Sequence, residues 1–259
     1  MRDNTQLSHR IGDKTTGNYA LYRRRDSLRI QVDFYVNKDI RFYNPLNEAM
    51  TAFIYRCIGI GNANYSKQLH EGFKRLGYKK FVYHSYNISQ NKKIIQFNLK
   101  KGITTLILTS ALEDTIVNFA KGLVKIGSVQ LFGYSFNIKE IKLISEPEFS
   151  NSEIFNAISP VYATDVNGNW LNIKKTEEKL KENLIEKYYA LYDRLPNNTN
   201  IKIRILSNQT EYIRYKKDTF RGYTGIVAIE GDKELIRLAY EGGLGARCGQ
   251  GMGLLQVLN

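Results

Sequence analysis

The sequence predicts an α+β protein built from two similar halves. Its 259 residues are 42% hydrophobic, an ordinary content for a globular protein and enough for one large domain or two small ones. Short runs of alternating apolar and polar residues predict strands, and longer runs with apolar residues three or four positions apart predict helices. In each half these runs follow the order strand, helix, strand, strand, helix, strand.

The first half begins with a strand at 28–34, Leu-Arg-Ile-Gln-Val-Asp-Phe, in which every second residue is apolar. Pro45 then opens a helix, and a second helix from about 64 to 76 is stopped by Gly77. Their apolar stripes are Leu46, Met50, Phe53 and Cys57, and Tyr65, Leu69, Phe73 and Leu76. The remaining elements are strands at 81–88, 93–99 and 104–108, a helix at 111–124, and strands at 128–131 and 137–144.

The second half is expected to begin after Glu146-Pro147-Glu148, which divides the chain into domains at 28–147 and 148–259. Residues 1–27 show no periodicity and predict a flexible basic arm. A helix capped by Thr176 is expected to bury Leu180, Leu184, Tyr188, Leu191 and Leu195. The other elements are strands at 154–162, 201–206, 211–215 and 219–229, a helix at 232–240, and a last strand at 254–258.

The order of elements in each half is that of the ferredoxin-like, or RRM-like, split βαβ motif. Two such units in tandem predict two four-stranded antiparallel sheets, each with helices on one face. The halves share no repeated residue pattern, so the duplication rests on the order of elements alone.

The charge balance indicates a polyanionic partner. The chain has 38 Lys and Arg against 25 Asp and Glu, a formal net charge of +13, which favours nucleic acid or an anionic membrane surface. No apolar run approaches the roughly 20 residues that span a bilayer, and residues 1–27 lack an apolar signal-peptide core. Some of the 18 Tyr and 12 Phe could stack on unpaired bases, although most are expected in the core. Nucleic acid is therefore favoured over a membrane.

Metal and nucleotide chemistry are not indicated. The two cysteines, Cys57 and Cys248, lack metal-ligand spacing and are too few for a disulfide framework. The three histidines, His9, His70 and His84, form no ligand cluster, and the glycine fingerprints of nucleotide-binding loops are absent. We therefore expect no metal and no cofactor, and a location in the reducing cytoplasm.

The most distinctive segment is 241–253, Glu-Gly-Gly-Leu-Gly-Ala-Arg-Cys-Gly-Gln-Gly-Met-Gly. Six glycines among residues 242–253 remove side chains where a backbone must approach another group closely. Exposed N–H groups of this loop are expected to bind phosphate oxygens, and Arg247 adds a guanidinium. A flexible hairpin leading to the last strand is the structural alternative.

The spacing of this segment resembles that of a known family. Gly243-Leu244-Gly245, five residues including Arg247, and then Gly251-Met252-Gly253 resemble the C-terminal signature of the CRISPR repeat-processing endoribonucleases, which belong to the wider group of repeat-associated RNA-binding proteins. Residues 52–58, 65–71, 79–83 and 158–161 (Ile-Ser-Pro-Val) also resemble segments of that family. The resemblance covers 28–259 in order, and the arm at 1–27 departs from it.

The resemblance implies a metal-independent endoribonuclease that cuts CRISPR precursor RNA within its repeats. Attack by the 2′-hydroxyl would leave a 2′,3′-cyclic phosphate and a 5′-hydroxyl. The family's Tyr-His-Lys set falls on Tyr55, His70 and Lys79, with Lys80 as an alternative to Lys79. CRISPR repeat RNA is the implied partner, together with possible subunits of a CRISPR effector complex. The expected RNA-binding residues are Gly243, Gly245, Arg247, Gly251 and Gly253 of the loop, together with Lys80 of the first half.

Helix geometry is consistent with exposed roles for two of these residues. At about 100° per residue, Tyr55 lies roughly 160° from the centre of its helix's apolar stripe, and His70 about 105° from the centre of its own. His70 is expected to protonate the leaving oxygen, because histidine titrates near neutrality. Tyr55 would lie near the 2′-hydroxyl, and Lys79 would stabilise the phosphorane. The acid and base roles of Tyr55 and His70 could be exchanged.

Further basic residues lie on or between strands of the second half, interleaved with Tyr212, Tyr215 and Tyr223, a pattern that suits phosphate contacts and base stacking. They are Lys202, Arg204, Arg214, Lys216, Lys217 and Arg221. A solvated strand face is the alternative for each. His84 is expected to be either structural or RNA-facing, and His9 to have no role.

Two other functions compete with cleavage. One is a non-catalytic RNA-holding subunit of a CRISPR effector complex, which would keep the glycine segment without cutting. The other is a general RNA-binding protein of the RRM type, but no run matches the aromatic signature of that module.

Overall fold

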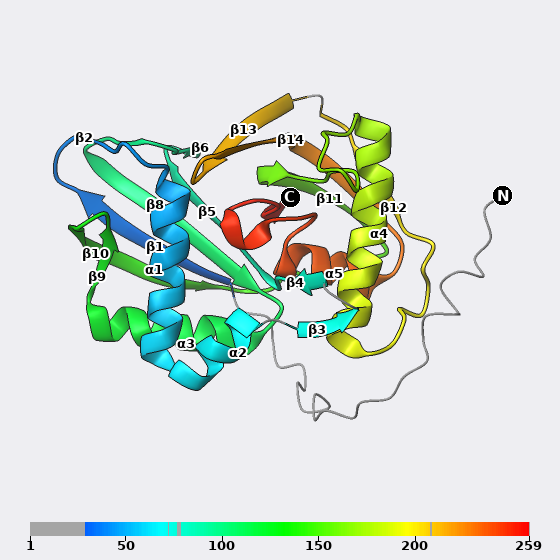
Figure 1. Cartoon of the computed structure of the whole chain (residues 1–259), viewed down its shortest axis with the longest axis horizontal. Coiled ribbons are helices and arrows are strands. Elements are labelled where there is room, and N and C mark those ends of the chain that lie inside the picture. Colours follow the sequence, from blue (N-terminus) through cyan, green and yellow to red (C-terminus); the bar gives the residue numbers. More distant parts are fainter. Residues whose placement is uncertain (1–28, 72, 77–78, 208, 259) are drawn as a thin grey trace.

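The computed structural model describes residues 29–71, 73–76, 79–207 and 209–258, and at 70, 71, 73–76 and 79–81 it describes the backbone alone. Two antiparallel sheets lie side by side, each with helices packed on one face (Figure 1). The C-terminal segment lies between them, in the middle of the molecule. The predicted α+β class is confirmed, and the expected arm at 1–27 lies outside the described residues.

The first sheet contains a βαββαβ unit whose four strands lie in the order β5-β8-β1-β10, as the ferredoxin-like motif requires. Short hairpin strands, β6 beside β5 and β9 beside β10, widen it to six strands, so the prediction of four is wrong in number. The strands are β1 (Arg29–Val36), β5 (His84–Gln90), β6 (Lys93–Ile94), β8 (Gly102–Ser110), β9 (Ser128–Leu131) and β10 (Tyr134–Ile144). The helices are α1 (Leu46–Gly61) and α3 (Glu113–Ile126).

The second sheet repeats this order as β12-β14-β11-β15. This sheet has five strands where four were predicted, because β13 pairs as a hairpin with the first part of the long strand β14. The strands are β11 (Ser152–Val161), β12 (Lys202–Ile205), β13 (Gln209–Tyr215), β14 (Asp218–Glu230) and β15 (Leu255–Val257). The helices are α4 (Ile173–Tyr192) and α5 (Lys233–Gly242).

The second predicted helix is shorter than expected. It ends as α2 (Ala63–Glu71), and the next residues form β3 (Phe73–Leu76), which pairs with β4 (Lys79–Phe81). The spacing of Tyr65, Leu69 and Phe73 fits a helix, but antiparallel pairing of two adjacent short runs prevails over that periodicity. A further pair joins β2 (Ile40–Arg41) to β7 (Asn98–Leu99), which splits the strand expected at 93–99.

The start of α4 corrects another expectation. Asn172, not Thr176, caps the helix, and its side chain accepts a hydrogen bond from the Lys175 amide. Leu195 lies beyond the helix and is exposed, whereas Leu180 and Leu184 are buried as expected.

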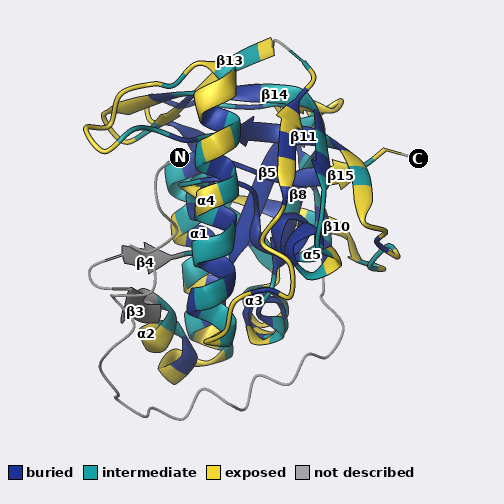
Figure 2. Ribbon diagram, turned by 90° about the vertical axis from the view of Figure 1, so that its right-hand side faces the viewer, coloured by how far each residue is buried: buried dark blue, intermediate teal, exposed yellow. Residues whose placement is uncertain are grey.

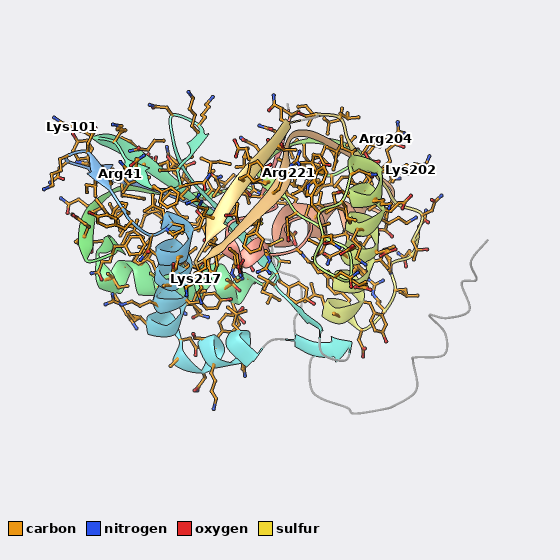
Figure 3. The ribbon with its side chains drawn as sticks, turned by 45° about the horizontal axis from the view of Figure 1, so that its top comes forward. Arg41, Lys101, Lys202, Arg204, Lys217 and Arg221 are labelled. Carbon is orange, nitrogen blue, oxygen red and sulfur yellow. The ribbon has the colours of Figure 1, made fainter. Side chains whose placement is uncertain are left out.

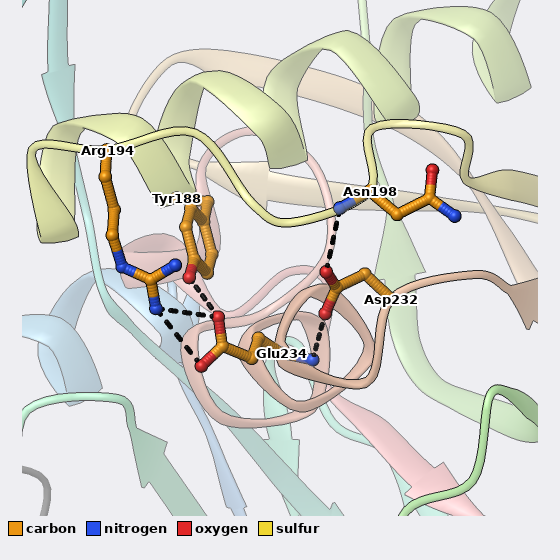
Figure 4. A network of polar contacts seen from close by, with 5 residues as sticks. All are labelled: Tyr188, Arg194, Asn198, Asp232 and Glu234. Atoms are coloured by element: carbon orange, nitrogen blue, oxygen red, sulfur yellow. Dashed lines mark hydrogen bonds and ion pairs between the residues drawn. The ribbon is translucent and has the colours of Figure 1, made fainter.

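A polar network fixes the end of α4 against the start of α5 (Figure 4). The Tyr188 hydroxyl and the Arg194 guanidinium both donate to the Glu234 carboxylate. Asp232 caps α5 by accepting from the Glu234 amide at 2.8 Å, and its other oxygen accepts from the Asn198 amide.

Each half has its own apolar core. In β1 the side chains of Ile30, Val32, Phe34 and Val36 are fully buried under α1 and α3, as the alternating pattern predicts. The second core lies between the second sheet, α4 and α5, and it includes Tyr83 and Leu112 from the first half. Figure 2 shows the central strands of both sheets as buried and the outer side of α4 as exposed. No helix in the described part of the chain combines the length and apolarity needed to cross a membrane.

Arg29 joins the two halves. Its side chain is buried, and the guanidinium donates to the carbonyl oxygens of Leu255 at 2.8 Å and Tyr240 at 3.2 Å. The same group lies 3.8 Å from the centroid of the Tyr240 ring. Burial lowers the pKa of Arg29 to about 10, so it remains a cation at neutral pH. The expected boundary at 146–148 lies between β10 and β11, and the division into domains stays a prediction.

Candidate functional site

The glycine-rich segment starts where α5 ends, and a buried lysine forms hydrogen bonds with the carbonyl groups at that end. Lys187 of α4 is 2% exposed, and its ammonium donates to the carbonyl oxygens of Gly243 at 2.7 Å and Gly242 at 3.2 Å. A cation at the carboxyl end of a helix is stabilised by the helix dipole. Burial lowers the pKa of Lys187. Lys187 therefore fixes the direction in which the chain leaves α5.

The segment then folds into a single short turn, the 3₁₀ helix η3 (Cys248–Gln250). The Cys248 thiol donates to the Gly245 carbonyl at 3.4 Å and lies 3.9 Å from the Lys187 ammonium. Burial raises the pKa of Cys248, so the thiol stays protonated at neutral pH. These buried contacts make the segment a packed part of the structure, not the flexible hairpin of the structural alternative.

The expectation of exposed amides is wrong for several of these residues. Gly253 donates to the Pro160 carbonyl at 2.9 Å, Leu244 to Gly253 and Ala246 to Tyr162. Gly243, Gly245, Gly251 and Gly253 are all buried. The reason for glycine here is close packing inside the protein. Arg247 is the exposed residue of the segment, and contact of these residues with RNA stays a prediction.

Among the glycines of this segment, Gly253 has the tightest surroundings. Its φ is +71°, and a Cβ added there would lie 2.2 Å from the Leu244 carbonyl oxygen. Gly251 is similar, since its φ is +85° and a Cβ would lie 2.7 Å from the Asn47 amide nitrogen. The segment must therefore carry glycine at both positions to lie against α1 and its own backbone.

A polar stripe of α1 binds the η3 turn. The Asn47 amide donates to the Gln250 carbonyl at 3.1 Å, and the Thr51 hydroxyl donates to the Gly249 carbonyl at 3.2 Å. Thr51 also contacts the Tyr86 hydroxyl at 2.7 Å. Residues four apart lie on one face of a helix, so Tyr55 continues the same stripe. The glycine segment and the predicted catalytic tyrosine are therefore neighbours, although they lie in different halves of the sequence.

Tyr55 lies against a buried histidine. The ring centroids of Tyr55 and His84 are 5.6 Å apart in an edge-on arrangement. Tyr55 is partly exposed, as its place off the apolar stripe predicts, and desolvation raises its pKa to about 12. The phenol is therefore protonated at neutral pH and can donate a hydrogen bond.

His84 is 1% exposed, so the RNA-facing alternative for it is wrong. Among the described residues neither ring nitrogen has a hydrogen-bond partner, and Nε2 lies against the backbone of Gly249. Burial and then the nearby Lys187 charge lower its pKa to about 4. His84 is therefore a neutral packing residue behind Tyr55.

The side chains of the other catalytic candidates lie outside the described residues. The backbone of His70 belongs to α2, and those of Lys79 and Lys80 belong to β4. Their distances to Tyr55 are therefore not part of the described geometry, and their roles stay predictions.

The basic candidates of the second half do not share one face. Lys202 and Arg204 alternate with the buried Ile203 and Ile205, so they point away from the second core. Figure 3 shows them on β12, with Arg221 further along β14 and Lys217 at the hairpin turn beside α1. Arg204 also pairs with Glu230, a contact between exposed groups that contributes little to stability.

Arg214 and Arg247 are held by aromatic rings. The Arg247 guanidinium lies 4.1 Å from the centroid of the Phe220 ring, on β14. Arg214 lies 5.6 Å from the Phe97 centroid. The side-chain amide of Gln96 makes two hydrogen bonds with the backbone of β13. It donates to the Tyr212 carbonyl at 2.7 Å and accepts from the Arg214 amide at 3.2 Å. The hairpin is thus fixed to the first half.

Among the described residues, no cluster of three His, Cys, Asp or Glu side chains could hold a metal ion. The side chains beside the glycine segment include the Tyr55 phenol, the Asn47 amide, the Thr51 hydroxyl and the Lys187 ammonium. Such a set can donate hydrogen bonds to an anion and stabilise its charge.

Comparison with known proteins shows which family this chain is similar to. The family model described as "CRISPR associated protein Cas6, C-terminal" matches residues 144–257, which contain the whole second sheet and the glycine segment. The CRISPR-associated endoribonuclease Cas6 1 of Methanocaldococcus jannaschii is 28% identical over 249 residues, 89% of this chain and 93% of the relative. The chain is similar to Cas6 endoribonucleases over most of its length. The resemblance inferred from the glycine spacing is therefore confirmed.

Other Cas6 proteins agree with this assignment. The CRISPR-associated endoribonuclease Cas6 of Pyrococcus furiosus is 25% identical over 233 residues, 85% of this chain and 86% of the relative. A solved structure described as CRISPR associated protein Cas6 superposes with a TM-score of 0.70 at 26% identity, covering 90% of this chain and all of that one. The tandem ferredoxin-like fold is thus shared with a Cas6 structure.

Sequence reasoning missed several residues that build this site. Lys187 lies in a helix rich in charged residues and gave no signal of burial. Asn47 and Thr51 could have been found, because they precede Tyr55 at intervals of four.

Replacement of Gly253 tests the packing of the segment. Gly168→Ala is the control, because Gly168 also has a positive φ but has nothing within 4 Å of an added Cβ. Gly168→Ala should lower the free energy of unfolding by about 1–2 kcal/mol, because alanine is strained in a left-handed backbone conformation. Gly253→Ala should lower the free energy of unfolding in urea by at least about 2 kcal/mol more, because its Cβ meets a carbonyl oxygen. Equal losses would contradict the packing described.

The pKa of His84 makes stability depend on pH. Between pH 6.5 and about 4 the unfolded chain binds a proton at this residue and the folded chain does not. Stability should therefore be full above pH 6.5 and should fall as the pH approaches 4, by up to about 3 kcal/mol. Urea unfolding of wild type and His84→Gln across this range isolates the effect. If the free energy of unfolding depended on pH equally in wild type and in His84→Gln, His84 would not be a neutral buried residue.

Proposed function

We propose that this chain is an endoribonuclease that cleaves CRISPR precursor RNA within its repeats. The observation that carries the proposal is the match to Cas6 endoribonucleases over 89% of the chain. It is supported by the contact between the glycine segment and the helix that bears Tyr55. The formal net charge of +13 fits a polyanionic substrate.

The reaction uses the nucleophile that RNA carries. The 2′-hydroxyl beside the scissile phosphate attacks phosphorus, the bond to the 5′-oxygen breaks, and a 2′,3′-cyclic phosphate and a 5′-hydroxyl result. A proton must leave the 2′-oxygen and another must reach the 5′-oxygen, while charge develops on the phosphorane. The chain's own groups can supply these needs without a metal ion.

Three residues receive roles in this proposal. His70 protonates the leaving 5′-oxygen, because an imidazole titrates near neutral pH. Lys79, with Lys80 as the alternative, stabilises the phosphorane charge. The raised pKa of Tyr55 favours the role of hydrogen-bond donor to the reacting phosphate over that of general base.

The RNA-binding surface includes the exposed Arg247 and the cations of the second half. These cations are Lys202, Arg204, Arg214 and Arg221. In this proposal Gly243, Gly245, Gly251 and Gly253 act by holding Arg247 and the η3 turn in place beside α1. Subunits of a CRISPR effector complex are proposed as further partners. The proposed location is the cytoplasm, which suits the free cysteines Cys57 and Cys248.

Cleavage of a labelled repeat RNA in EDTA tests the proposal. Native RNA should be cut, whereas RNA with a 2′-deoxy nucleotide at the cut site should bind and stay intact, because it lacks the nucleophile. Cutting of the deoxy substrate would rule out 2′-hydroxyl attack. Native RNA that binds without being cut would favour a non-catalytic RNA-holding subunit.

Substitution of His70 tests its assignment. His70→Ala should slow cleavage roughly 10²–10⁴-fold, as expected for the loss of one acid–base group, with little change in the Kd for RNA. His9→Ala is the matched control, since His9 lies outside the region that resembles the family. A rate for His70→Ala equal to that of His9→Ala would exclude His70 as the acid.

A further inference from the structure

Two half-exposed aromatic rings share one arginine on the outer side of the β13–β14 hairpin. The Arg221 guanidinium lies 4.0 Å from the centroid of the Trp170 ring and 5.8 Å from that of Tyr212. Trp170 remains 41% exposed and Tyr212 53% exposed. Large aromatic surfaces are usually buried, so two exposed rings at one cation mark a surface suited to a ligand.

The strands hold Tyr212 and Arg221 together. The two residues are register partners of β13 and β14, and such partners point to the same face of a sheet. The neighbouring pair, Ile213 and Phe220, points to the opposite face and packs against Met252 of the glycine segment. The aromatic pair and Arg221 therefore lie on the face of the hairpin that is turned away from the glycine segment.

Trp170 is held in position from a different part of the chain. It follows a tight turn in which Asp165 accepts hydrogen bonds from the amides of Asn167 and Asn169, and it pairs with Thr164. Its ring packs 5.7 Å from that of the buried Tyr223. The indole is thus supported from beneath, which lowers the entropy lost when a ligand stacks on it.

Arg221 carries a charge that no acidic side chain of the described residues neutralises, because in that part of the chain no carboxylate forms an ion pair with it. The nearby hairpin also carries Arg214, Lys216 and Lys217. The combination of flat rings with unpaired positive charge suits a ligand that has both planar rings and phosphates.

We propose that Trp170, Arg221 and Tyr212 form a stacking platform for unpaired nucleobases of single-stranded RNA. Aromatic rings bind bases through their faces, and the guanidinium contacts the connecting phosphates. Because the platform faces away from the glycine segment, it binds a stretch of the RNA away from the scissile bond. This inference rests on the proposed function, since it assigns a second contact for the same RNA.

The chain carries its own probe for this site, because Trp170 is its one tryptophan. Tryptophan fluorescence is measured while repeat RNA with a 2′-deoxy nucleotide at the cut site is added. Stacking of a base on the indole should quench the emission in a saturable way. An abasic oligonucleotide of the same length should bind without quenching, and equal quenching by it would overturn the stacking.

Variants separate the platform from the cleavage site. Trp170→Ala and Tyr212→Ala should each raise the Kd for repeat RNA by roughly 5- to 150-fold, the range for loss of one base–aromatic stack. The cleavage rate at saturating RNA should not change. Trp170→Phe should restore most of the affinity. Tyr134→Ala, which removes a ring that is 43% exposed on the first sheet, is the matched control.

The outcomes are distinguishable from failure of the proposed function. If wild type cuts repeat RNA but its tryptophan emission does not respond to saturating RNA, the platform is wrong and the proposed function stands. If Trp170→Ala and Tyr134→Ala change the Kd equally, the platform is also wrong. If wild type neither binds nor cuts repeat RNA, the proposed function itself fails.

Discussion

The contact between the buried ammonium of Lys187 and the last carbonyls of α5 determines the arrangement of the site. These carbonyls are buried at the negative end of a helix, where an unpaired oxygen would be costly. The cation satisfies both and directs the chain toward Cys248, so that the η3 turn meets the polar stripe of α1. Loss of this cation would leave the glycine segment without a fixed starting point.

The docking of η3 on α1 unites two regions that the sequence separates. Asn47 and Thr51 bind the turn, and Tyr55 lies about one helical turn further along the same face of α1. A neutral His84 behind Tyr55 excludes water, and desolvation of the phenol keeps its proton in place. The glycine segment of the second half and Tyr55 of the first half are therefore neighbours on one side of α1.

Local patterns predicted most of the elements. The alternation in β1 and the stripe of α1 each lie against one core, so their periodicity alone reveals them. The strand β3 was mistaken for helix because four residues are too few for the period to decide. The exposure of the glycine segment was mispredicted for a different reason, since its close contacts are with residues about 200 positions away. A lysine in a charged helix is usually solvated, and only the position of α5 reveals that Lys187 is not.

The late position of the glycine segment has a consequence for biogenesis. Its partners include Asn47 and Ser85, and the strand that follows it holds Arg29, 226 residues earlier. Contacts of such high sequence separation form slowly, because a long chain must close before they contribute. Until residues 241–257 have been synthesised, neither the contacts of the glycine segment with Asn47 and Ser85 nor the contact of β15 with Arg29 can form. The contacts that join the η3 turn to α1 can therefore form only after most of the chain has been synthesised.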